Sequence, residues 1–211
     1  MSAVPPSTPP IDGEWVEKDA GRVGVWLFIA SEILLFGTFF ASYIGTRLGN
    51  EQCALGVSVW PEAGHLPGLT LATINTLILL TSSFTMVRAI SRAERGDAQG
   101  LKSYLKATIA LGGCFLIVKA AEYGLKISHH LYPGSEAVKA NAGLAIFLSY
   151  YYAMTILHGL HVIVGMIWNF TVLAGAGGPS PRVAHRAELA GLYWHFVDVV
   201  WVFLFPMLYL I

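Results

Sequence analysis

Five long stretches of the chain are almost uninterrupted in hydrophobic residues, and short polar segments separate them. The stretches cover about residues 23–46, 68–87, 104–128, 143–170 and 189–211. Each is about 20 residues or longer, enough to cross a hydrocarbon core of ~30 Å at a rise of ~1.5 Å per residue. The pattern therefore predicts an all-α fold, a polytopic membrane protein built as a bundle of five transmembrane helices.

The first 20 residues differ from the rest of the chain because they are polar and rich in proline. They lack the basic segment followed by an apolar run that marks a secretory signal. We interpret residues 1–20 as a flexible N-terminal tail and residues 21–211 as a single transmembrane helical bundle. The prolines of this tail are Pro5, Pro6, Pro9 and Pro10.

Composition supports the membrane interpretation and excludes one class of partner. Hydrophobic residues make up 55% of the chain and charged residues only 12%, which is outside the usual mix of a globular domain. The formal net charge is zero. Because nucleic-acid binding depends on a positive surface, no nucleic-acid partner is expected.

One predicted side of the membrane carries more lysine and arginine residues than the other. Because cytoplasmic loops are enriched in basic residues, this bias predicts the orientation. With the N-terminus in the cytoplasm, nine basic residues lie inside and three lie outside, and the C-terminus lies on the periplasmic or outer side. The inner set is Lys18, Arg22, Arg88, Arg92, Arg95, Lys102, Lys106, Arg182 and Arg186, and the outer set is Arg47, Lys126 and Lys139. The basic segment between the second and third helices is interpreted as a topology signal, with a lipid-headgroup site as the alternative.

The two cysteines argue against a redox centre in this chain. Cys53 falls in a predicted outer loop and Cys114 in the third helix, with no paired spacing. No Cys-x-x-Cys-His sequence is present, so neither a c-type haem attachment nor a dithiolate metal centre is predicted.

Ionisable residues inside the predicted helices are the candidate functional groups, because such residues lose hydration unless they find a partner. In the first helix, Glu32 shares a face with Phe28, Phe36 and Phe39, and no cation lies on that face within one turn. We expect desolvation to keep Glu32 mostly protonated. The opposite face carries small residues that favour close approach of another helix, namely Gly37, Ala41 and Gly45.

Lys119 and Glu122 lie three residues apart in the third helix, a spacing at which opposite charges pair on one face. We interpret them as an internal ion pair. The second helix is rich in hydroxyl side chains, interpreted as packing groups that hydrogen-bond across helices or to their own backbone.

Four more ionisable residues lie in the last two helices: His158, His161, His195 and Asp198. Counting ~1.5 Å per residue places Glu32, His158, His161 and Asp198 at similar depth, so these four can form one cluster, whereas Glu122 belongs to the outer half. Imidazole and carboxylate groups also suit a metal. The His158 and His161 spacing can place both rings on one metal, but paired hydrogen-bonding histidines in a membrane need none. We therefore prefer a hydrogen-bonded structural or proton-related cluster.

Five segments, in order, resemble subunit III of haem-copper oxidases, the family of cytochrome c oxidase and quinol oxidase. They are residues 30–43 (ASEILLFGTFFASY), 75–83 (NTLILLTSS), 119–123 (KAAEY), 158–162 (HGLHV) and 193–201 (YWHFVDVVW). The resemblance covers almost the whole membrane portion. Longer members have seven helices, and this chain is similar to the short five-helix bacterial form that begins at the third. Its end, residues 205–211 (FPMLYLI), lacks the tryptophan-rich finish common in the family.

The resemblance implies an accessory subunit, non-catalytic itself, that docks on catalytic subunit I and other subunits of a terminal oxidase and contacts membrane phospholipids. It implies that Glu32 corresponds to the family's intramembrane carboxylate. Haem and copper are expected in partner subunits, with no cofactor or metal in this chain. The expected role is to stabilise the catalytic subunit and to support proton uptake in aerobic respiration, in a bacterial inner membrane. Two alternatives stay open: an accessory subunit of nitric oxide reductase, and a small ion or proton transporter.

Overall fold

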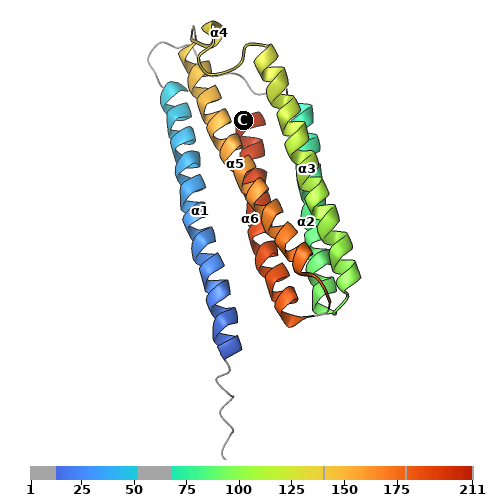
Figure 1. The fold of residues 1–211 in the computed structure, drawn as a ribbon. Helices are drawn as coiled ribbons and strands as arrows, with labels where there is room; N and C mark the ends of the chain where they lie inside the picture. Colours follow the sequence, from blue (N-terminus) through green and yellow to red (C-terminus); the bar gives the residue numbers. More distant parts are fainter. Residues whose placement is uncertain (1–12, 52–67, 140, 179, 211) are drawn as a thin grey trace, which may run out of the picture.

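A computed structural model describes residues 13–51, 68–139, 141–178 and 180–210, and these residues form six helices with no strand among them (Figure 1). Five of the helices are long and apolar enough to cross a membrane, which confirms the predicted five-helix, all-α fold. The helices are α1 (Gly13–Glu51), α2 (Leu69–Glu94), α3 (Ala98–Ser128), α4 (Glu136–Lys139), α5 (Ala142–Gly175) and α6 (Pro181–Tyr209).

Helix boundaries extend beyond the hydrophobic stretches that predicted them. Helix α1 begins at Gly13 rather than near residue 23, and α6 begins at Pro181 rather than near residue 189. Proline suits the first turn of a helix because its missing N–H would have no partner there. The tail predicted for the first 20 residues falls partly outside the described residues, as do its four prolines and Cys53.

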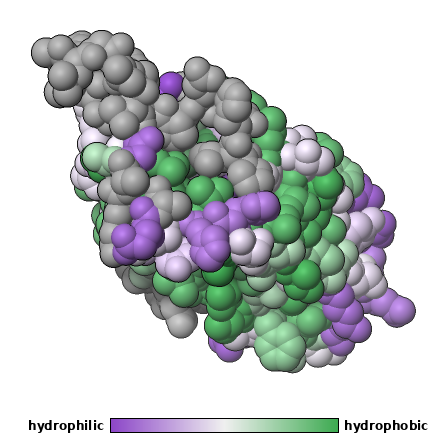
Figure 2. Space-filling view, turned by 90° about the horizontal axis from the view of Figure 1, so that it is seen from above, coloured by the Kyte–Doolittle hydropathy of each residue, from purple (hydrophilic) through white to green (hydrophobic). Residues whose placement is uncertain are grey.

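The long helices run alternately up and down, so the molecule has two distinct ends (Figure 1). We call the end that holds α4 the α4 end, and the end that holds the turn between α2 and α3 the Asp97 end. Figure 2 looks down on the α4 end and shows hydrophobic residues along the flank of the bundle. This distribution is the one expected for helices whose outer surfaces face lipid.

Four helices form the compact part of the molecule and α1 lies beside them. Helix α6 contacts α2 and α5, α3 contacts α2 and α5, and α1 contacts only α5 and α6 among the described helices. In the most hydrophobic stretch of each helix, 61% of the residues of α6 are buried but only 17% of those of α1. Helix α6 is thus the central helix, and α1 is the peripheral one.

The centre of the bundle is organised around Trp194 of α6. Its Nε1 donates to Ser82 Oγ on α2 at 2.9 Å, and its ring lies against two glycines, Gly112 of α3 and Gly165 of α5. A Cβ atom added to Gly165 would lie 2.7 Å from this ring, so only glycine fits there. The indole fills the space left by the absent side chains, so α2, α3 and α5 all pack around this one residue.

The small-residue stripe of α1 was predicted to favour close approach of another helix, and no described helix of this chain packs against it. Gly37, Ala41 and Gly45 are all exposed, and a Cβ atom added to either glycine would meet nothing within 4 Å. Helix α1 instead turns Ile29, Phe36 and Tyr43 towards the bundle. Large aromatic side chains fill the wide space between the peripheral helix and its neighbours better than small ones do.

The turn at the Asp97 end is fixed by local chemistry. Gly96 has a φ of 72°, in the left-handed region that favours glycine, and Asp97 caps α3 by accepting a hydrogen bond from the Gly100 N–H at 2.8 Å. That amide, assisted by Arg92 at 3.0 Å, lowers the pKa of the Asp97 carboxyl below its ordinary value. The short connection holds α2 and α3 antiparallel.

Candidate functional site

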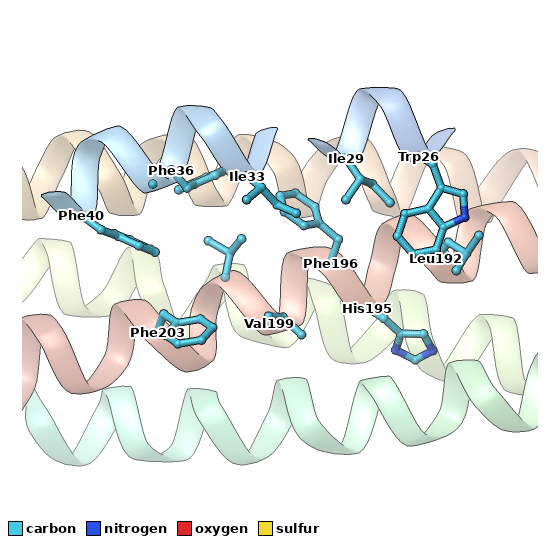
Figure 3. Close-up of a pocket in the computed structure, with 12 residues that line it drawn as sticks. Trp26, Ile29, Ile33, Phe36, Phe40, Leu192, His195, Phe196, Val199 and Phe203 are labelled. Atoms are coloured by element: carbon cyan, nitrogen blue, oxygen red, sulfur yellow. The ribbon is translucent and has the colours of Figure 1, made fainter. Parts of the chain in front are cut away.

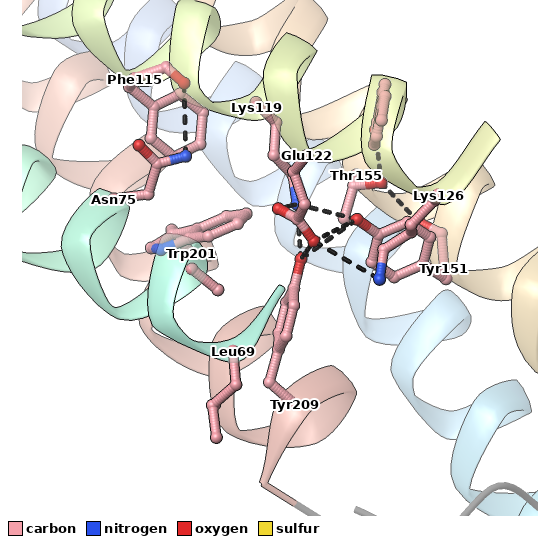
Figure 4. Close-up of polar contacts among 12 residues, drawn as sticks. Leu69, Asn75, Phe115, Lys119, Glu122, Lys126, Tyr151, Thr155, Trp201 and Tyr209 are labelled. Carbon is pink, nitrogen blue, oxygen red and sulfur yellow. Dashed lines mark hydrogen bonds and ion pairs between the residues drawn. The ribbon is translucent and has the colours of Figure 1, made fainter. Parts of the chain in front are cut away.

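The buried polar groups of the bundle gather in three places. The first is the Glu122 cluster near the α4 end, composed of Lys119, Glu122, Lys126, Tyr151 and Tyr209 (Figure 4). The second is a pair between α1 and α5, and the third joins α2 to α6. We describe each before asking what the set can do.

The Glu122 carboxylate is the hub of the Glu122 cluster. Lys119 Nζ lies 2.8 Å from Glu122 Oε2, and Lys126 Nζ lies 3.7 Å from Oε1. The hydroxyls of Tyr151 and Tyr209 each donate to Oε1 at 2.7 Å. The cluster thus ties α3 to α5 and to the last turn of α6, and its carboxylate is fully buried.

Two lysines face one carboxylate in this cluster, and aromatic rings compensate for the extra positive charge. Lys119 Nζ lies 5.1 Å from the ring centroids of both Tyr151 and Trp201, and Lys126 Nζ lies 4.7 Å from that of Tyr151. A cation over a ring face is attracted by the ring's negative quadrupole. The charged groups of the cluster are thus stabilised by one another and by the surrounding aromatic rings.

The start of α2 is fitted to the same cluster. Gly68 has a φ of 126°, and a Cβ atom added there would lie 2.9 Å from Glu122 Oε1. Both observations require glycine at this position. The chain entering α2 therefore covers the Glu122 carboxylate.

Glu32 pairs with His161 of α5, and this is the second site. Glu32 Oε2 lies 2.9 Å from His161 Nε2, and both side chains are largely buried, with 14% and 13% of their surfaces exposed. His161 Nδ1 lies 2.8 Å from the backbone oxygen of Leu157, which it reaches by donating its own proton. Nε2 is then the acceptor or, in the charged ring, a second donor, so a proton is shared between the acid and the imidazole.

Other polar contacts hold α1 along its length. At the Asp97 end, Arg22 Nη2 lies 2.6 Å from Glu188 Oε1 of α6. Towards the α4 end, Ser42 Oγ lies 2.6 Å from the Tyr150 hydroxyl, and Tyr43 donates to the Met207 backbone oxygen at 3.1 Å. Because apolar packing gives little net drive between helices in lipid, such contacts are a large part of what holds a peripheral helix.

The third site joins α2 to α6 through Ser83 and His195. Ser83 Oγ lies 2.8 Å from His195 Nδ1. Asp198, one turn further along α6, lies beside Ser83 with 5% of its surface exposed. Neither of its carboxyl oxygens has a hydrogen-bond partner in the described part of the chain.

His158 occupies a different environment from the other histidines. It is completely buried, and its ring lies between Phe115 and Trp201, with centroid distances of 5.6 and 5.1 Å. Neither ring nitrogen has a hydrogen-bond partner among the described residues. Its contacts are those of an aromatic core residue.

The structure thus divides the single cluster expected from helix depth. Glu32 meets His161 but not His158, and Asp198 lies beside Ser83 of α2. The side-chain hydrogen bonds of His161 and His195 run to α1 and α2, respectively, and not between α5 and α6. Similar depth in the membrane is necessary for two side chains on different helices to meet. The direction in which each side chain leaves its helix then decides its partner.

Sequence reasoning missed Tyr209 and the full role of Lys126. The lysine had been counted only as an outer-side charge, yet it is buried against Glu122. Tyr209 lies 87 residues from Glu122 in sequence, so no local spacing links them. A usable signal was the single hydroxyl in the apolar C-terminal turn, since a buried tyrosine hydroxyl usually finds a partner.

No group of three or more histidine, cysteine, aspartate or glutamate side chains suited to a metal ion occurs within the described ranges. Of the predicted site residues, only Glu32 and His161 come together as an acid and imidazole pair. The expectation that this chain carries no metal or haem stays a prediction.

Fold and site together define a class: an all-helical, polytopic membrane protein in which Glu32 and Glu122 are paired within the bundle. Residues 14–211 match the family model of cytochrome c oxidase subunit III. The chain is 34% identical over 204 residues to cytochrome c oxidase subunit 3 of Thermostichus vulcanus, covering 95% of this chain and 92% of that one. It is 32% identical over 199 residues to quinol oxidase subunit 3 of Bacillus spizizenii, covering 92% and 90%. The chain belongs to the cytochrome c oxidase subunit III family.

Proposed function

We propose that this chain is the accessory subunit III of a bacterial haem-copper terminal oxidase, held in the inner membrane against the catalytic subunit. The observation that carries the proposal is the family match over residues 14–211, which includes every transmembrane helix. Relatives named as subunits of cytochrome c oxidase and of quinol oxidase match over most of their own length. Haem and copper belong to the partner subunits in this proposal.

The geometry favours a structural and accessory role for this chain over catalysis by its own residues. The Glu122 cluster satisfies its own charges, and the Glu32 and His161 pair links the peripheral helix to the bundle. An acid that shares a proton with an imidazole can hold two helices together and can also take up or release a proton. We assign Glu32 to these two roles, holding α1 in place and supporting proton uptake by the partner.

Copurification tests the proposal most directly. An affinity tag on this chain, used on gently solubilised membranes, is expected to recover a haem-containing polypeptide together with it. The optical spectrum of the eluate shows the haem, and metal analysis after the subunits are separated is expected to leave haem and copper with the partners. Recovery of the intact chain alone, without haem protein, would contradict the proposal.

A further inference from the structure

A groove of about 460 Å³ runs between α1 and α6 on the surface of the bundle (Figure 3). Its walls include Trp26 and Phe40 of α1 and Phe203 of α6, and almost all of its lining is apolar. His195 is the only ionisable residue among the twelve that line it. Among the described residues that line the groove, His195 is therefore the one side chain that can exchange a proton with it.

Behind His195, a line of polar groups leads from the groove into the core. His195 Nδ1 lies 2.8 Å from Ser83 Oγ, and Ser83 lies beside the buried carboxyl of Asp198. No cation in the described part of the chain pairs with Asp198, and both of its oxygens lack a hydrogen-bond partner there. Lys119, a cation buried in the core, is paired with Glu122.

In two arrangements with a neutral histidine, the Ser83 hydroxyl both accepts and donates, and so links the other two groups. A serine hydroxyl has one hydrogen to donate, and a neutral imidazole has one donor and one acceptor nitrogen. If Asp198 is protonated, it donates to Ser83 Oγ, Ser83 donates to His195 Nδ1, and Nε2–H points to the groove. If Asp198 is ionised, every hydrogen bond reverses: Nδ1–H donates to Ser83, and Ser83 donates to the carboxylate.

We propose that His195, Ser83 and Asp198 form a proton relay that connects the groove between α1 and α6 to a carboxyl group in the bundle core. A proton added at Nε2 displaces the Nδ1 proton to Ser83 Oγ, and the serine proton passes to Asp198. One N–H bond forms at the groove, one O–H bond forms on Asp198, and the hydroxyl of Ser83 is restored. The relay stores one proton, and the reverse sequence releases it.

Asp198 is protonated in the resting state of this relay. An unpaired carboxylate at membrane depth costs several kcal/mol, whereas a neutral acid that donates to Ser83 does not carry that cost. The described geometry contains no hydrogen bond between Asp198 and Ser83, so the proposed relay requires a side-chain rotation or a bridging water to form it. The relay is a property of this chain's own residues and does not depend on its membership of an oxidase.

Infrared difference spectroscopy of the full chain in lipid nanodiscs at neutral pH tests the relay. Subtracting the spectrum of D198N from that of the parent is expected to leave the C=O stretch of one protonated carboxylic acid. Glu32→Gln as the common background removes the other candidate acid at mid-depth. In this background S83A is expected to shift the Asp198 band to higher frequency, because the hydrogen bond is lost, and S83T is expected to leave it in place.

Two further measurements keep the relay separable from simple burial. The rate at which the Asp198 band shifts in D2O is expected to fall in H195F, because this substitution removes the route from the groove. The matched variant H185F is expected to leave the rate unchanged, since His185 lies near the Asp97 end of α6. Nitrogen NMR of labelled histidine is expected to show His195 protonated at Nε2. No carboxylic band lost in D198N, or a band insensitive to both S83A and H195F, would overturn the relay.

Discussion

At the scale of single residues, the three buried acids of this protein differ in their partners. Glu122 is ionised and saturated by two lysines and two tyrosines, Glu32 shares a proton with His161, and Asp198 has no partner of its own. These differences follow from the helices that each acid faces. The consequences of substitution should therefore differ from acid to acid.

Glu32 gives the first prediction. Glu32→Ala removes the contact with His161 and is expected to loosen α1, whereas Glu32→Gln keeps a hydrogen-bonding side chain of similar volume. A double-mutant cycle with His161→Phe should give a coupling of about 0.6 kcal/mol, and at most about 1.7, as for other polar contacts in membranes. Unfolding of the four chains in mixed micelles measures it.

The same two variants separate a holding role from a protonic one in the assembled oxidase. If Glu32→Gln keeps assembly and sustained turnover while Glu32→Ala loses them, the residue holds the helices together. If Glu32→Gln already alters proton-coupled turnover with assembly intact, its titration matters. Unchanged behaviour of both variants would contradict both roles.

Asp97 gives a prediction on pH. Its pKa is lowered in the folded chain by the Gly100 N–H and by Arg92, so the carboxylate stabilises the start of α3 at pH values above its ordinary pKa of 3.8. That contribution is lost as the pH falls through the lowered pKa. Thermal unfolding in detergent should therefore show an acid-side decline that is weaker in Asp97→Asn.

The exposed residue Glu94 provides the control for Asp97, since it lies at the end of α2 in the same turn region. Glu94→Gln is expected to keep the acid-side decline. An equal change in both variants would show that general surface charge, and not the cap of α3, governs the effect.

At the scale of helices, the sequence predicted which segments form helices but not which of their faces meet. The hydrophobic stretches were long enough to identify every transmembrane helix. In a membrane helix, however, lipid-facing and protein-facing positions are both apolar, so periodicity gives little information on orientation. The glycines illustrate this: Gly37 and Gly45 are exposed in this chain, whereas Gly112 and Gly165 contact Trp194.

Glycine substitutions test this distinction. Gly165→Ala is expected to destabilise the bundle by about 1–3 kcal/mol, because its Cβ would overlap the Trp194 ring. Gly45→Ala meets nothing and should be neutral or slightly stabilising, since alanine is the better helix former by about 0.5–1 kcal/mol. Denaturant unfolding of the two variants compares them. Equal stability would show that α5 can move away from α6 at little cost.

The Glu122 cluster gives a prediction for the contact between α3, α5 and α6. Glu122→Gln leaves two buried lysines without their carboxylate and should cost about 3–5 kcal/mol of unfolding free energy. Glu188→Gln breaks the exposed pair with Arg22 and should cost at most about 1 kcal/mol. Comparable losses of unfolding free energy in the two variants would mean that water reaches Glu122 and its lysines.

At the scale of the whole molecule, the sequence predicted the fold class fully and the site only in part. The spacing of Lys119 and Glu122 sufficed for a pair on one helix. The contacts from Glu32 to His161 and from Tyr209 to Glu122 span 129 and 87 residues, and they depend on how five helices are arranged. That arrangement is a property of the bundle, which no local pattern contains.

The charge bias makes a prediction about the whole molecule in its membrane. Gly96 lies at the Asp97 end and the last turn of α6 at the opposite end (Figure 1). With nine basic residues predicted on the inner side, a reporter fused at Gly96 is expected in the cytoplasm and one fused after Ile211 on the outer side. Enzymatic reporters active on only one side measure this. Both reporters on the same side would refute the topology.

The peripheral place of α1 also bears on the order in which the protein is made. Helix α1 leaves the ribosome first, yet its only partners in the described bundle, α5 and α6, are synthesised last. At ordinary rates of synthesis, the 129 residues between Glu32 and His161 take roughly 6 to 26 s to produce. For that time Glu32 lacks its partner; α5 then supplies His161, and α6, made last, completes the bundle around α1.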